Sequence, residues 1–142
     1  MLVESDPHNA GLARQGAAEA GLSQVEVRVA DASRVANYAD ALPADVLLLC
    51  GIFGNVSEDD IQRTARAAPA LCAAGATVIW TRHRRAPDLT PRIREWFRAG
   101  GFEEVAFDTP DTEALTGVGV GRLAAGPQAR LPLGPLFTFL PA

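Results

Sequence analysis

The stretch DVLLLCGIFGN, from Asp45 to Asn55, decides the fold. It is continuously apolar from Val46 to Cys50, which is typical of a β-strand buried on both faces of a sheet. Gly51 and Gly54 then indicate a loop that leaves the strand. Strands covered on both faces belong mainly to parallel sheets flanked by helices, so this stretch favours an α/β fold.

Strand and helix patterns alternate on both sides of this stretch. The predicted strands span residues 2–4, 25–29, 45–50, 76–81, 102–107 and 115–123, and the predicted helices span 7–20, 33–42, 57–72 and 90–99. Pro69 predicts a break or kink in the third helix. This order predicts a doubly wound, mostly parallel sheet with right-handed crossovers. The last two strands have no helix between them, so they are expected to form a C-terminal antiparallel hairpin.

The bulk properties exclude several classes of protein. The 142 residues suit one domain, and a net charge of -4 disfavours general nucleic-acid binding. The longest apolar run, from Val46 to Cys50, is far too short to span a membrane, and the N-terminus has no secretory pattern. Cys50 and Cys72 form neither a disulfide framework nor a metal-binding spacing. We therefore expect a reduced, cytoplasmic protein without a metal, and its oligomeric state stays open.

Acidic residues end two predicted strands, at the sheet edge where open α/β folds bind ligands. Glu4 ends the first strand, and a carboxylate there can accept hydrogen bonds from the two hydroxyls of a ribose. Asp31 and Ala32 end the second strand, where the carboxylate could accept from the amine of adenine and the next N–H could meet a ring nitrogen. The alternatives are a solvated acid at Glu4 and a helix cap at Asp31.

Polar residues after the next two strands are candidates for contacts with a substrate. Asn55 could orient a substrate through its amide, although the loop around it could equally be a simple turn. The run Arg82-His83-Arg84-Arg85 could receive an anionic group, and His83 could act as a general base. Such a run is also typical of a solvated surface, and no partner for His83 can be assigned from the sequence.

These segments resemble, in order and spacing, the motifs of class I S-adenosylmethionine-dependent methyltransferases. The stretch from Val3 to His8 is similar to that family's second-strand motif, and Val27 to Ala32 resembles its third-strand motif. Asp45 to Asn55 is similar to the fourth-strand motif, and Ala73 to Val78 resembles the turn into the fifth strand. Gly100 to Phe102 resembles the step into the terminal hairpin. The resemblance covers residues 2–123 and implies a Rossmann-like sheet.

The resemblance also implies a cofactor, S-adenosylmethionine, and a place for it. Its ribose would lie on Glu4 and its adenine at Asp31, while the loop after the fourth-strand motif would line its methionine end. The implied cofactor-binding residues are Glu4, Asp31, Ala32, Cys50 and Gly51. The methyl acceptor is expected to be a small molecule, and the residues expected near it are Asn55, Arg82 and His83. No residue can be assigned as catalytic from the sequence.

The chain departs from the family at the first strand and the glycine-rich loop, which should precede Met1. In the family, that strand lies between the strands that end here at Glu4 and Cys50. We expect an N-terminally truncated domain over residues 1–123 and a proline-rich tail over 124–142, whose apolar run Leu136–Leu140 could fill the gap. We also expect the chain alone to bind the cofactor weakly or not at all, because unpaired backbone groups would flank the gap.

Three functions remain open at this point. A methyltransferase needs no fixed nucleophile or metal, because its donor is already activated and positioning supplies much of the catalysis. A non-catalytic remnant or partner subunit would keep the fold without turnover. A nicotinamide-dependent, NAD(P)-binding Rossmann protein would also place an acid at the end of its second strand. The predicted terminal hairpin and the pair Asp31-Ala32 disfavour this third function.

Overall fold

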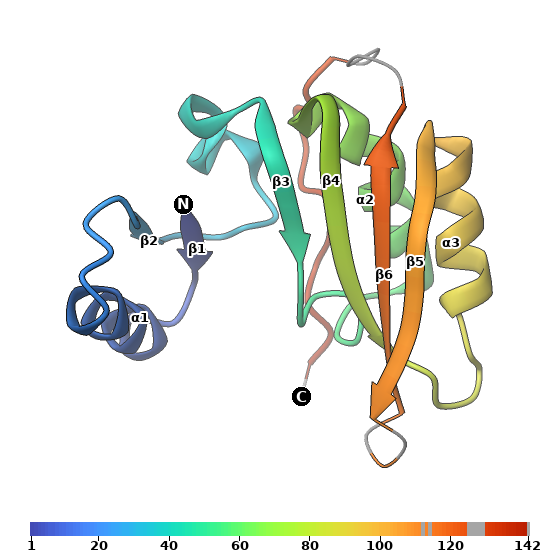
Figure 1. Ribbon diagram of the computed structural model, residues 1–142, viewed down its shortest axis with the longest axis horizontal. Coiled ribbons are helices and arrows are strands. Elements are labelled where there is room, and N and C mark those ends of the chain that lie inside the picture. The colour runs from blue at the N-terminus through green and yellow to red at the C-terminus, as the bar shows by residue number, and fades with distance from the viewer. Residues whose placement is uncertain (112, 114, 125–129, 142) are drawn as a thin grey trace.

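Figure 1 shows the computed structural model, which describes residues 1–111, 113, 115–124 and 130–141. Helices and strands alternate, and two short 3-10 helices, η1 (Val35–Asn37) and η2 (Ala39–Ala41), precede the third strand. The other elements are β1 (Leu2–Glu4), α1 (Pro7–Glu19), β2 (Val27–Val29), β3 (Ala44–Leu49), α2 (Glu58–Leu71), β4 (Cys72–His83), α3 (Thr90–Ala99), β5 (Phe102–Asp111) and β6 (Thr116–Leu123). Within these ranges, no helix is long and apolar enough to cross a membrane.

The strands form two separate sheets. β1 pairs with β2 in parallel, and the larger sheet has the strand order β3-β4-β6-β5. β3 and β4 are parallel, whereas β6 is antiparallel to both β4 and β5. The predicted α/β fold, with parallel strands and a C-terminal antiparallel hairpin, is confirmed. The last strand of the chain, β6, lies inside the sheet, so β5 forms its outer edge.

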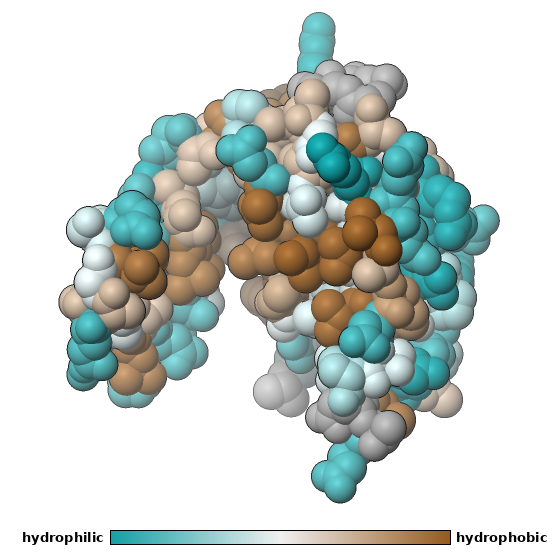
Figure 2. Space-filling view, in the orientation of Figure 1, coloured by the Kyte–Doolittle hydropathy of each residue, from teal (hydrophilic) through white to brown (hydrophobic). Residues whose placement is uncertain are grey.

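The facing edges of β1 and β3 have no strand between them in the part of the chain that the structure describes. Both strands point in the same direction, and β1 lies between β2 and β3 (Figure 1). Figure 2 shows a hollow between the N-terminal unit and the larger sheet. The backbone N–H and C=O groups on these two edges therefore lack ladder partners. This is the position at which the resemblance places an additional parallel strand.

The apolar run Leu136–Leu140 does not fill this position, and that expectation is wrong. Leu136 and Phe137 are buried in the main core, and Phe139 forms an isolated antiparallel bridge with Val56 in the loop after β3. The N–H of Leu136 also donates to the Ser33 carbonyl at 2.8 Å. Leu136 and Phe137 thus gain full cover in the core, whereas Phe139 and Leu140 stay 49% and 56% exposed.

A buried carboxylate near the start of α2 holds this C-terminal run in place. Asp60 is 7% exposed, and its Oδ2 accepts a hydrogen bond from the N–H of Thr138 at 3.0 Å. One turn later, the hydroxyl of Thr64 lies 3.2 Å from the Leu136 carbonyl oxygen. α2 itself begins at the cap Ser57, whose hydroxyl accepts from the N–H of Asp60 at 3.2 Å. One end of the helix therefore organises both its own first turn and the C-terminal segment.

Glycines in β6 make room for aromatic side chains on the helix-covered face of the larger sheet. α2 and α3 lie on that face (Figure 1), and Trp80 of β4 packs there over Gly119. A Cβ atom on Gly119 would lie 2.2 Å from the indole ring. Trp80 is 2% exposed and stacks on Phe97 of α3, with ring centroids 6.0 Å apart. The space left by the glycines of β6 is thus filled by the side chains of neighbouring elements.

The opposite face of the same sheet carries an apolar band that no described helix covers. Val46 and Leu48 of β3 are 55% and 60% exposed. Ile79 and Val120 are paired across β4 and β6 and continue the band, which Figure 2 shows across the front of the sheet. The prediction that residues 45–50 are buried on both faces is therefore wrong for one face, because α2 and α3 both pack on the other.

Several predicted elements differ in extent or type; β2 begins two residues later than predicted and β5 extends to Asp111. β4 is longer than predicted, so Arg82 and His83 are its last residues and pair with β6 instead of following the strand. Residues 33–42 form two 3-10 helices, and Ser33 is buried without capping either of them. α2 continues through Pro69 to Leu71, because a proline so near the helix end disrupts little of the remaining helix.

Adding a methyl group at Gly119 should destabilise the fold. The Cβ of Gly119→Ala would overlap the Trp80 ring, and such overpacking typically costs about 1–3 kcal/mol. Gly11→Ala is the matched control, because nothing lies within 4 Å of a Cβ at that helical position. Urea unfolding should show a lower free energy of unfolding for Gly119→Ala and no loss for Gly11→Ala. An unchanged free energy for Gly119→Ala would contradict the packing described.

Candidate functional site

Glu4 stands at the carboxyl end of β1 and is half-buried. Its Oε1 accepts a hydrogen bond from the N–H of Asp6 at 2.9 Å. Asp6 in turn caps α1, where Pro7 occupies the first position and the N–H of His8 donates to the Asp6 carboxylate at 2.7 Å. The start of α1 thereby fixes the backbone beside Glu4. Within the described residues, Oε2 of Glu4 has no hydrogen-bond partner and can accept from a ligand.

Asp31 and Ala32 follow β2 at the same edge as Glu4, because β1 and β2 are parallel. Oδ1 of Asp31 accepts from the N–H of Ser33 at 2.8 Å and closes a local turn. The 3-10 helix η1 has Arg34 at its N-cap position and no side-chain cap, so Asp31 does not act as the helix cap that the sequence offers as the alternative. Oδ2 of Asp31 makes only a long contact of 3.7 Å with Nε of Arg34. One carboxylate oxygen of Asp31 is therefore available for a ligand.

Tyr38 supports this turn and could not be assigned from the sequence. Its hydroxyl donates to the Ala32 carbonyl at 3.1 Å. Burial, together with the charge of Asp31, raises the pKa of Tyr38 to about 12, so the hydroxyl remains a donor at neutral pH. Tyr38 lies between η1 and η2, and only the observed turn brings it back to Ala32.

The loop after β3 depends on glycine at its first position. Gly51 has a φ of 74°, a left-handed conformation that favours glycine. Its N–H donates to Oγ1 of Thr81 at 3.1 Å, and its carbonyl accepts from Nδ2 of Asn55 at 2.8 Å. Asn55 therefore closes the turn with its amide nitrogen and leaves its amide oxygen for other contacts. Thr81, at the end of the neighbouring strand, is a second residue that the sequence reasoning missed.

A cavity of about 350 Å³ opens at the carboxyl ends of β3 and β4, and its size lies within the range of small-molecule sites. The described residues that line it include no carboxylate. They are Gly51, Gly54, Asn55, Thr81, Arg82, His83, Arg85 and Thr116. The structure thus brings together Asn55, Arg82 and His83, the three residues expected near a substrate.

Two of these side chains carry buried nitrogen atoms without partners among the described residues: Nε of Arg82 and Nδ1 of His83. Arg82 is held by a hydrogen bond from Nη1 to the carbonyl of Phe53. Burial, and then the charges of Arg82 and Arg85, lower the pKa of His83 below its usual 6.5, while Asp88 acts in the opposite direction. His83 is therefore mostly neutral at pH 7, and Arg82 and Arg85 give the cavity a positive charge.

The expected site residues form two groups that lie along one edge of the structure. Glu4, Asp31 and Ala32 belong to the β1–β2 unit, whereas the lining of the cavity belongs to the larger sheet. Cys50 and Gly51 follow β3 and stand on the side of the unpaired edges. The thiol of Cys50 is exposed, and partial desolvation raises its pKa, so it is not an activated nucleophile.

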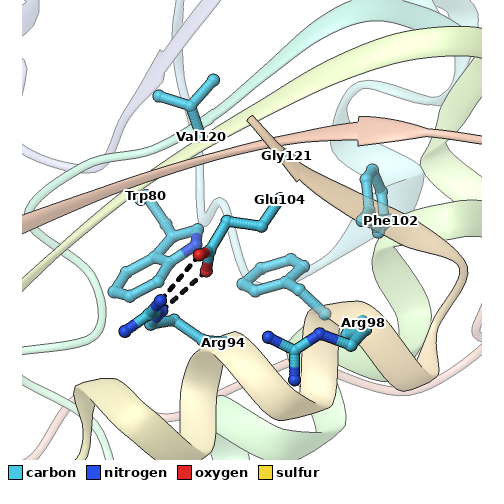
Figure 3. A pocket seen from close by; sticks show the side chains of 9 residues that line it. Trp80, Arg94, Arg98, Phe102, Glu104, Val120 and Gly121 are labelled. Atoms are coloured by element: carbon cyan, nitrogen blue, oxygen red, sulfur yellow. Dashed lines mark hydrogen bonds and ion pairs between the residues drawn. The ribbon is translucent and has the colours of Figure 1, made fainter. Parts of the chain in front are cut away.

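A second, much smaller cavity beside Trp80 has a structural role (Figure 3). Its volume is about 10 Å³, which is room for no more than about one water molecule. Arg94 of α3 and Glu104 of β5 close it with hydrogen bonds of 2.6 and 2.7 Å. The Arg94 guanidinium holds the pKa of Glu104 below its usual range. Across the described ranges, no group of histidine, cysteine or acidic residues could hold a metal ion.

The fold is similar to that of several solved structures. An O-methyltransferase family protein from Burkholderia thailandensis aligns with a TM-score of 0.67 and 16% identity, over 88% of this chain and 43% of that one. The S-adenosylmethionine-dependent methyltransferase SibL, in its apo form, aligns with a TM-score of 0.58 and 22% identity, over 86% of this chain and 42% of that one. The chain has a class I methyltransferase-like fold.

One further solved structure has a similar fold, whereas the sequence comparisons find no relative. A possible exported protein from Bordetella parapertussis aligns with a TM-score of 0.62 and 18% identity, over 87% of this chain and 52% of that one. The chain thus spans between 42% and 52% of the length of these structures. No family model matches the sequence, and no curated protein sequence is significantly similar to it. At such low identities, structural similarity establishes the fold alone.

His83 is predicted to titrate below its usual pKa of 6.5. The chain has two histidines, so in a His8→Gln variant the imidazole signals in an NMR titration belong to His83 alone. Adding Arg85→Gln should raise the midpoint, because one nearby cation is removed. The unfolded chain binds this proton more readily than the folded chain does, so the free energy of unfolding should rise with pH between the midpoint and 6.5. A midpoint at or above 6.5 would show that His83 is neither desolvated nor close to the two cations.

Proposed function

We propose that the chain forms the part of an S-adenosylmethionine-dependent methyltransferase that binds the cofactor's adenosine and the methyl acceptor. The observation that carries the proposal is the placement of Glu4 and the Gly51–Asn55 loop on either side of the unpaired edges of β1 and β3. The methyltransferase-like fold supports it, and two of the similar structures are named as methyltransferases. The chain spans only 43% and 42% of the length of these two structures, so the activity of a whole enzyme also belongs to the proposal.

The residues at this edge fit the adenosine part of the cofactor. Oε2 of Glu4 is free to accept from a ribose hydroxyl, and hydrogen bonds to a carboxylate are among the stronger ones. Oδ2 of Asp31 is similarly free to accept from the amine of adenine. The backbone N–H of Ala32 makes no hydrogen bond with another described residue, so it can donate to a ring nitrogen. Cys50 and Gly51 would then lie toward the methionine end.

When bound, the cofactor would supply an activated methyl group, so the chain need not supply a nucleophile. Neither cysteine is suited to act as one, because desolvation raises the pKa of both thiols and Cys72 is fully buried. The role of this chain would be to hold the acceptor next to the methyl group in a productive orientation.

A non-catalytic remnant or partner subunit is the second candidate function. The open edges of β1 and β3 favour it, because they leave the position between the two groups of site residues without protein backbone in the described chain. A dinucleotide-dependent oxidoreductase fits less well. Rossmann sheets of that kind continue with parallel strands, whereas here antiparallel β6 lies next to β4.

Replacing Glu4 should selectively weaken nucleoside binding. In an NMR titration of the chain with S-adenosylhomocysteine, amide signals of residues 4–6, 31–33 and 50–52 should shift, even if binding saturates only at high concentration. Glu4→Gln should weaken binding by roughly tenfold, the equivalent of about 1.4 kcal/mol. The matched control is Glu19→Gln, because Glu19 is an exposed acid whose carboxylate, among the described residues, contacts Gln15 of the same helix alone.

NAD in place of S-adenosylhomocysteine separates the candidate enzymes. Shifts caused by NAD but not by S-adenosylhomocysteine would replace the proposed function with the oxidoreductase. Signal shifts confined to residues outside the three segments would contradict the assigned cofactor edge. Saturable binding without methyl transfer to any acceptor would favour the non-catalytic candidate.

A further inference from the structure

We infer that the cavity at the ends of β3 and β4 selects a small acidic acceptor, in which a carboxylate lies next to the hydroxyl group to be methylated. Arg85 and Arg82 would receive the carboxylate, and His83 would accept the hydroxyl proton. The inference rests on the proposed function for its reaction. The binding that it describes can nevertheless be measured without any cofactor.

The charge of the cavity is the first argument. Arg82 and Arg85 both line it, and the lining that the structure describes contains no acidic side chain. Neither guanidinium has a carboxylate within ion-pair distance among the described residues, although six of the other arginines form such pairs within 3.7 Å. The chain as a whole has a net charge of -4, so this positive cavity is a local exception. A cation-lined cavity attracts anions and disfavours cationic molecules.

The nearest acid does not neutralise this charge. The Asp88 carboxylate accepts hydrogen bonds from the N–H and hydroxyl of Thr90 at 2.9 and 2.7 Å. It also lies 3.6 Å from Nε of Arg84, which is not a lining residue. The Asp88 carboxylate is thus engaged by Thr90 and Arg84. Arg85 has no carboxylate partner among the described residues, so it is available to pair with a ligand carboxylate.

The shape of the cavity leaves His83 accessible to a ligand. A Cβ atom on Gly54 would lie 3.7 Å from Cδ2 of His83, so any larger side chain there would cover the imidazole. The turn at Gly51, which Asn55 and Thr81 hold, places Gly54 beside the end of β4. Nδ1 of His83 is buried without a partner in the described chain, so a ligand would reach the imidazole from the side of Cδ2, which faces Gly54. The absence of a side chain at Gly54 therefore keeps the imidazole of His83 open to the cavity.

Neutral His83 is suited to accept a proton. Three charged groups act on the imidazole: Arg82 on the same strand, and Arg85 and Asp88 in the segment that follows it. The two cations lower its pKa, and a bound carboxylate would partly offset them. As the hydroxyl proton moves to His83, the acceptor oxygen uses its electron pair to bond the methyl carbon. The carbon–sulfur bond breaks, and its electron pair stays on a neutral thioether.

Salicylate, which carries a carboxylate next to a hydroxyl, is the probe for this inference. It should bind the chain in an NMR titration, with shifts at Gly54, His83 and Arg85, whereas phenol should bind at least about tenfold more weakly. Arg85→Gln should weaken salicylate binding by about tenfold, as expected for loss of one charge-assisted contact. Arg66→Gln, which removes an exposed charge from α2, is the control and should leave binding unchanged.

The pKa of His83 supplies a second readout, which a purely structural role would not change. Saturating salicylate should raise the midpoint of His83 in the His8→Gln background, because the carboxylate adds a negative charge next to the imidazole. Phenol should not raise it. Equal binding of salicylate and phenol, or salicylate binding that is unaffected by Arg85→Gln, would overturn the inference.

The two proposals can fail separately. Salicylate binding to the cavity without S-adenosylhomocysteine binding at Glu4 would remove the proposed function and keep the acidic-ligand site. S-adenosylhomocysteine binding at Glu4 without salicylate binding would do the reverse. Because Arg85 lies outside the proposed cofactor contacts, Arg85→Gln should leave the affinity for S-adenosylhomocysteine unchanged.

Discussion

The pairing of β4 with β3 on one side and with β6 on the other holds the larger sheet together. The same strand supplies the core, because Val78 and Trp80 alternate toward the helix-covered face and are 0% and 2% exposed. Its last residues, Arg82 and His83, line the cavity together with the loop after β3. Core packing against the glycines of β6 therefore also sets the position of the residues at the end of β4.

The β1–β2 unit depends less on this arrangement. It shares no ladder with β3, and its acids Glu4 and Asp31 are fixed by local turns, through the N–H groups of Asp6 and Ser33. One half of the candidate site is thus built by short-range hydrogen bonds and the other half by the packing of a sheet. The unpaired edges between them are the place where the two halves would have to be joined for catalysis.

The sequence predicts most of the elements because their signals are local. Asp6-Pro7 and Ser57 start helices, and the strand at residues 45–50 follows from its run of apolar residues. Features set by partners distant in the chain were not predictable in this way. β4 extends to His83 because β6 pairs with it, and one face of β3 stays exposed because both helices pack on the other. Thr81 and Tyr38 support the site through contacts that only the folded chain creates.

A crystal structure of the chain grown with S-adenosylhomocysteine tests the central claim most directly. We expect electron density for the nucleoside at the carboxyl ends of β1 and β2, with a ribose hydroxyl within hydrogen-bond distance of the Glu4 carboxylate and the adenine next to Asp31 and Ala32. Density for the nucleoside elsewhere on the molecule, with the Glu4 carboxylate free of it, would show that this edge does not bind the cofactor.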